Sequence, residues 1–104
     1  MNSTERELMI EQRRLMLSNL ATIYPAPMAG DKVYHTVLYV YPDYTRHRAM
    51  RDLMYFEEKG YVTRRKAGKR DNPNEGEWRT ILWGLTARGL DVHQQLASDP
   101  TLEV

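Results

Sequence analysis

The chain has 104 residues, of which 41% are hydrophobic, with a formal net charge of +1 and no cysteine. This length predicts one domain around a single core. The absence of cysteine excludes a disulfide scaffold, a thiol nucleophile and a thiolate metal site, as is usual for an intracellular protein. Charges interrupt the apolar residues of the first 17 positions (MNSTERELMIEQRRLML), so we expect neither a signal peptide nor a span of roughly 20 apolar residues. The sequence thus predicts a cytoplasmic protein that does not contact the membrane.

The small net charge hides a strong segregation of charge along the chain. Residues 46–70 carry nine cationic and three acidic side chains, a balance of +6, whereas the rest of the chain carries six cationic and eleven acidic ones, a balance of −5. Charge segregated in this way creates a local field that attracts a polyanion, and the acidic remainder limits unspecific adhesion. Nucleic acid is therefore the first partner to consider.

A long helix is expected at the start of the chain. Thr4 and Glu7 have the spacing of a capping box, and helix-favouring residues continue to Tyr24. Helical spacing predicts an inward stripe of Leu17, Leu20, Ala21 and Tyr24. Other sides of the helix are apolar too, which fits either a small domain that wraps the helix or a seam with a second copy.

The next element, residues 31–41, has an ambiguous pattern. A loop marked by Pro25, Pro27 and Gly30 precedes it, and Asp31 can cap its start. The run KVYHTVLYVY has the β-branched and aromatic content of a strand, but its valines also satisfy a helical stripe. From the residues alone, both alternatives stay open.

A basic helix is expected over residues 45–59. Thr45 can cap it, and Gly60 can end it, with Lys59 in the last turn. Its core positions would be Ala49, Leu53 and Phe56, which leaves toward solvent Arg46, His47, Arg48 and Arg51. Cations at the positive end of a helix dipole are locally unfavourable, and a phosphate backbone would account for them.

A β-hairpin and a last helix are expected in the remainder. Residues 61–66 and 78–85 have strand patterns around the polar loop 67–77, Thr86 can cap a helix to about Leu96, and residues 98–104 look frayed. By strand parity, Trp78 and Trp83 would lie on opposite faces, so we expect one in the core and the other exposed or at an interface.

Two segments carry a resemblance to known families. LMYFEEKGYV (53–62) and LTARGL (85–90) resemble the end of the recognition helix and the segment after the wing in MarR- and PadR-like regulators. RRLMLSNL (13–20), residues 45–62 and LTARGLDV (85–92) are similar to small winged-helix proteins of Mu-like phages. The similarity covers about residues 13–92, with a longer wing tip and Tyr61 in place of Leu or Ile as departures.

The resemblance implies an α+β winged helix-turn-helix domain over residues 1–104, with its core at about 4–97. Residues 31–41 would then be a helix, 45–59 the recognition helix and 61–85 the wing. Gly89, which would cost a helix about 1 kcal/mol relative to alanine, would be required by close packing. Because winged helices also bind proteins, the fold by itself does not assign the function.

Ten residues are expected to contact DNA. The exposed first turns of a recognition helix reach base edges and phosphates, and a basic wing reaches the backbone or the minor groove. The alternatives are a solvated helix face and, for Arg64 and Lys66, charges that guard an edge strand. The candidates are Thr45, Arg46, His47, Arg48 and Arg51 on the helix and Arg64, Arg65, Lys66, Lys69 and Arg70 on the hairpin.

The sequence offers no pattern typical of an enzyme. His35, His47 and His93 are not at metal-ligand spacing, and we find no phosphate loop, nucleophile elbow or carboxylate dyad. We therefore expect no catalytic residue, no metal and no cofactor. The sequence predicts a homodimeric, sequence-specific double-stranded DNA-binding protein, a phage-encoded transcription regulator. The alternative is a winged-helix inhibitor or adaptor that binds a host or phage protein through apolar residues of the first helix, the wing tip and the tryptophans.

Overall fold

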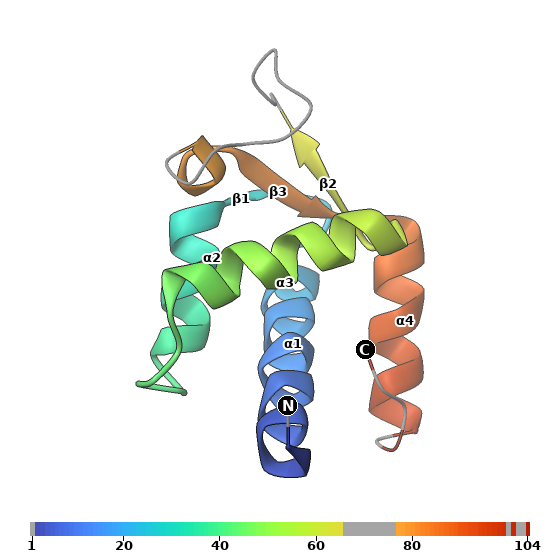
Figure 1. Cartoon of the computed structure of the whole chain (residues 1–104). Helices are drawn as coiled ribbons and strands as arrows, with labels where there is room; N and C mark the ends of the chain where they lie inside the picture. The colour runs from blue at the N-terminus through green and yellow to red at the C-terminus, as the bar shows by residue number, and fades with distance from the viewer. Residues whose placement is uncertain (1, 66–76, 100, 102–103) are drawn as a thin grey trace.

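The computed structural model describes residues 2–65, 77–99, 101 and 104. Within these residues the chain is α+β, with four α-helices and a three-stranded antiparallel sheet (Figure 1). No helix in this part of the chain is long and apolar enough to cross a membrane. The elements in chain order are α1 (Ser3–Ile23), β1 (Met28–Ala29), α2 (Gly30–Leu38), α3 (Arg46–Lys59), β2 (Val62–Arg65), the 3-10 turn η1 (Glu77–Arg79), β3 (Leu82–Leu85) and α4 (Ala87–Ser98).

The sheet has the strand order β1-β3-β2, so the returning strand of the hairpin lies in the middle. Val62 pairs with Leu85 and Arg64 with Trp83, which confirms the expected hairpin. The short strand β1 adds a third strand that the sequence did not predict, with Met28 opposite Trp83. Figure 1 shows α3 lying across α1, with the sheet along one side of α3 and the N-terminal half of α1 on the other.

Helix α1 begins at Ser3, and its cap differs from the predicted one. The side chain of Asn2, rather than that of Thr4, accepts a hydrogen bond from a backbone N–H, that of Glu5, at 2.8 Å. Asn is at least as good a cap as Thr, and Asn2 has the same three-residue spacing to a glutamate. At the other end Tyr24 lies beyond the helix and is exposed, so the predicted inward stripe ends before it.

Residues 30–38 form the helix α2, which settles the ambiguity in favour of the helical stripe. Val33, Tyr34 and Val37 are buried at helical spacing. Asp31 does not cap this helix, because the cap position is Ala29, which makes no side-chain hydrogen bond. Asp31 lies instead in the first turn, where its carboxylate is available to other elements.

Helix α3 follows the prediction closely. The Thr45 hydroxyl accepts a hydrogen bond from the backbone N–H of Arg48 at 3.1 Å. Gly60 ends the helix in the left-handed conformation (φ 78°), which glycine adopts without strain. The predicted core residues Ala49, Leu53 and Phe56 are fully buried.

The expectation that one tryptophan is exposed is wrong, because both are buried. Trp78 is 1% and Trp83 0% exposed. Strand parity does not apply to this pair, since β3 begins only at Leu82 and Trp78 lies in η1. The indole N–H of Trp83 donates to the backbone carbonyl of Trp78 at 3.0 Å, which joins the turn to the strand.

Helix α4 packs tightly against the start of the hairpin. Thr86 caps it through a hydrogen bond from the backbone N–H of Gly89 at 3.0 Å. A Cβ atom at Gly89 would lie 2.1 Å from the backbone oxygen of Tyr61, which confirms that close packing requires glycine there.

The tail is not frayed throughout, since Val104 is buried and its carbonyl accepts a hydrogen bond from Arg13 Nη1 at 3.4 Å.

Candidate nucleic-acid interface

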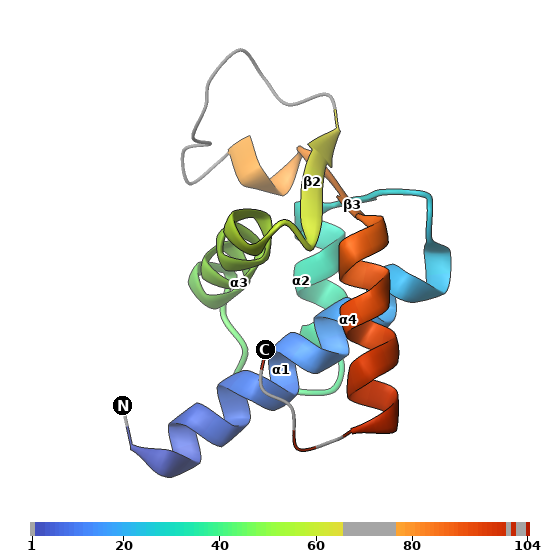
Figure 2. The same cartoon turned by 90° about the vertical axis from the view of Figure 1, so that its right-hand side faces the viewer.

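The exposed side of α3 is bordered by two other elements. Figure 1 shows the sheet along one long side of the helix, and Figure 2 shows the N-terminal turns of α1 extending past α3 on its outer side. Helix α3 and strand β2 are therefore neighbouring elements (Figures 1 and 2). Of the ten predicted residues, Lys66, Lys69 and Arg70 lie outside the described part of the chain.

Arg46, at the start of α3, is exposed but bound to an aspartate. Its Nε lies 3.1 Å from Asp31 Oδ1, and Arg79 Nε from η1 lies 3.2 Å from the same oxygen. The Arg46 guanidinium also lies 4.8 Å from the ring centre of Tyr34. Burial alone would raise the pKa of Asp31, but the hydrogen bond from Arg46 and the charge of Arg79 outweigh it and lower this pKa.

A second aspartate, Asp52, lies at the centre of a buried cluster on the inner side of α3. Its Oδ1 accepts hydrogen bonds from Arg13 Nε of α1 at 2.9 Å and from Arg51 Nε at 3.1 Å. The hydroxyl of Tyr44 donates to its Oδ2 at 2.8 Å, and burial together with the Asp52 charge raises the pKa of Tyr44 far above its usual range. The guanidinium of Arg13 further lies 4.0 Å from the ring centre of Tyr55. This cluster fixes α3 against α1.

The four predicted contact residues in the first two turns of α3 thus differ in exposure. His47 is exposed and makes no hydrogen bond or ion pair within the described residues. Arg48 is half-buried and donates to the carbonyl of Asp43 at 3.3 Å. Arg51 is also half-buried rather than fully exposed, because it is paired with the buried Asp52. Protein carboxylates therefore account for part of the cation excess at the start of α3.

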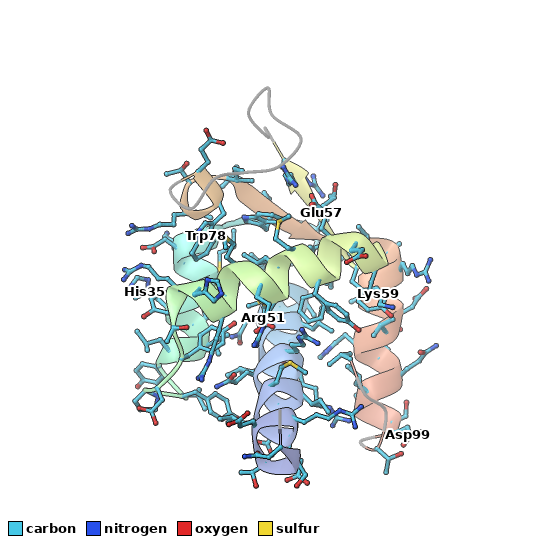
Figure 3. The ribbon with its side chains drawn as sticks, in the orientation of Figure 1. His35, Arg51, Glu57, Lys59, Trp78 and Asp99 are labelled. Atoms are coloured by element: carbon cyan, nitrogen blue, oxygen red, sulfur yellow. The ribbon has the colours of Figure 1, made fainter. Side chains whose placement is uncertain are left out.

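The two described arginines of the hairpin point to different partners. Arg64 forms a bidentate salt bridge with Glu57 of α3, in which Nε lies 2.6 Å from Oε2 and Nη2 lies 2.7 Å from Oε1. The side chain of Arg64 is 9% exposed. This salt bridge ties the hairpin to α3, and Figure 3 shows Glu57 on the part of α3 that faces the hairpin. Arg65 is exposed, with Nη2 3.3 Å from the carbonyl of Pro25.

The sequence reasoning missed the acidic partners of these arginines. One signal was available: Asp52 falls in the buried stripe of Ala49, Leu53 and Phe56, at i+3 from the first, where an acidic residue requires a buried counter-charge. Asp31 and Glu57 gave no such signal, because neither falls in a predicted buried stripe.

Neither a metal site nor a comparison with known proteins gives further information on this surface. Among the described residues, no group of three or more His, Cys, Asp or Glu side chains is arranged to hold a metal ion. Comparison of the chain with protein-family models, with curated proteins and with solved structures gives no match.

Proposed function

We propose that this chain is a sequence-specific double-stranded DNA-binding protein of the winged-helix type, with α3 in the major groove and the β2–β3 hairpin as the wing. The observation that carries the proposal is the first two turns of α3. They start at a Thr45 cap, hold no acidic residue in the first turn and carry Arg46, His47, Arg48 and Arg51. The helix-strand-helix-helix-hairpin order and the strand order β1-β3-β2 support the fold assignment.

The contacts within the protein suggest different roles for these side chains in DNA binding. His47 and Arg48 are the least engaged within the protein and would contact bases or phosphates directly. Arg46 is held by the exposed Asp31, which would compete with DNA for it, and Arg51 is held by the buried Asp52. Arg64 would orient the wing through Glu57, and Arg65 would contact the backbone.

Fluorescence anisotropy of the protein with a mixed-sequence duplex at several salt concentrations tests the proposal. Binding should weaken linearly on a log-log plot, with a slope of several units, because phosphate contacts release counterions. Arg48→Ala should reduce the slope by roughly one, whereas Arg88→Ala, which removes an exposed cation from α4, should leave it unchanged. Absence of binding at low salt would overturn the proposal.

Base readout is tested separately from backbone contact. With a duplex selected for tight binding, Arg46→Ala combined with His47→Ala should reduce the preference for that duplex over a random one. Arg65→Ala should weaken both duplexes equally, because phosphate contacts carry no sequence information. If the helix variant keeps the full preference, α3 does not read bases.

A protein partner is the second candidate, and one observation favours it. Tyr39 and Val40, between α2 and α3, are 91% and 54% exposed, and exposed aromatic residues are enriched in interfaces. The tryptophans give this candidate no support, because both are buried. A stoichiometric protein partner that resists nuclease in a pull-down and is lost with Tyr39→Ala would favour it.

A further inference from the structure

A hollow lies where the N-terminal half of α1 meets the start of α3. Its volume is about 130 Å³, and both helices contribute to its wall. In Figure 1 the N-terminal half of α1 lies on the side of α3 away from the sheet. Its lining consists of Glu5, Leu8, Met9, Gln12, Arg48 and Arg51.

Two buried nitrogen donors of this lining make no hydrogen bond to any described residue. Gln12 is only 2% exposed, and its Nε2 has no hydrogen-bond partner in the described part of the chain. Arg51 Nη2 lies 3.0 Å from Asp52 Oδ1 as an ion pair, but no described residue accepts a hydrogen bond from it. Buried side-chain donors are satisfied in the large majority of cases, so two unsatisfied donors around one hollow indicate a missing acceptor.

The charges around the hollow define the acceptor further. The lining itself carries Arg48 and Arg51 against Glu5, a balance of one positive charge, and the nearby Asp52 is paired with Arg13. A monoanion with several acceptor oxygens would neutralise this charge and satisfy the donors. Leu8 and Met9 add apolar surface to the hollow, which suits an anionic group that carries a sugar.

We propose that this hollow seats one phosphodiester of bound DNA, on the strand that flanks α3 on the side away from the hairpin. A phosphodiester carries one negative charge, and the attached deoxyribose would cover Leu8 and Met9. Gln12 and Arg48 donate to the phosphate oxygens, and Arg51 supplies charge from the wall. This site rests on the proposed function, and it makes α1 the counterpart of the wing.

The substitution Gln12→Leu tests the site, since it removes the donor and keeps the side-chain size. The affinity for any duplex should fall roughly tenfold, as for a lost hydrogen bond to a charged group, with an unchanged salt slope because no charge is removed. Arg48→Ala should instead reduce the slope by roughly one. The denaturation midpoint of Gln12→Leu should not fall, since no described residue accepts a hydrogen bond from the lost donor in the free protein.

Neutral methylphosphonate linkages, placed one at a time along the duplex, test the site without changing the protein. The wild type should lose affinity at one linkage beyond the edge of the α3 contact, and Gln12→Leu should lose little more at that linkage. If the wild type binds DNA but neither Gln12→Leu nor any such linkage weakens binding, the hollow is not a phosphate site and the proposed function stands. If the wild type binds no duplex at low salt, both proposals are overturned.

Discussion

Two aspartates, Asp31 and Asp52, each gather arginines from separate elements around α3, but one cluster is exposed and the other is buried. Asp31 holds Arg46 and Arg79 with its side chain 32% exposed, whereas Asp52 holds Arg13 and Arg51 with no exposure. Water and salt screen the first cluster and not the second. The comparison indicates that similar ion pairs have different strengths: the buried one fixes the position of α3 against α1, and the exposed one is weaker because water and salt compete with it.

Asp52→Asn should produce the largest effect, because it leaves the buried Arg13 and the half-buried Arg51 without a counter-charge. Removing one partner of a buried ion pair costs about 3 to 5 kcal/mol. Urea denaturation should show this loss in the free energy of unfolding. Asp31→Asn is the matched control, for which the loss should stay below about 1 kcal/mol. Equal losses for the two variants would show that burial does not distinguish the clusters.

Tyr44→Phe should have the next largest effect. It removes the buried hydroxyl that donates to Asp52 Oδ2 at 2.8 Å and leaves that oxygen with one bond fewer. A hydrogen bond to a charged group contributes about 1.5 to 3 kcal/mol, which thermal or urea denaturation would measure. Tyr34→Phe is the control, since the buried Tyr34 ring stacks on Tyr44 and its hydroxyl makes no hydrogen bond among the described residues. A loss as large for Tyr34→Phe would show that the removal of a tyrosine hydroxyl from this region, and not the bond to Asp52, causes the effect.

The same comparison explains which features could be predicted from the sequence. The caps at Thr45 and Thr86, the Gly60 terminus and the core stripe of α3 depend on residues a few positions apart, and all were predicted correctly. The partners of Arg46 and Arg64 come from positions 31 and 57 on neighbouring elements, so they depend on tertiary packing. The prediction that one tryptophan is exposed was wrong for a similar reason, because a turn that is hydrogen-bonded to β3 replaces the first half of the predicted strand.

Asp31→Asn should strengthen DNA binding if the proposed function holds. The aspartate competes with phosphate for Arg46 and Arg79, so its neutralisation should release both cations. Affinity for a mixed-sequence duplex should rise a few-fold at low salt, and the salt slope should steepen by roughly one for each added phosphate contact. Anisotropy titrations of Asp31→Asn and Asp31→Asn combined with Arg46→Ala measure this directly. If the double variant keeps the whole gain, Arg46 is not the released cation.

The smallest expected effect is the pH dependence of stability that the exposed Asp31 cluster produces. The pKa of Asp31 is lowered in the folded protein from its ordinary value of 3.8, because Arg46 and Arg79 favour the charged carboxylate despite its partial burial. The contribution of the Asp31 carboxylate to the free energy of unfolding is therefore fully present above its pKa in the unfolded chain. This contribution is lost as the pH falls through the lower pKa of the folded protein. The difference in unfolding free energy between wild type and Asp31→Asn should be constant from neutral pH to about pH 5 and should vanish at lower pH. Since the carboxylate is one-third exposed, this difference should stay below about 1 kcal/mol and shrink in high salt. A difference that grows on acidification would show that Asp31 is protonated more easily in the folded protein, and that the two arginines do not hold its charge.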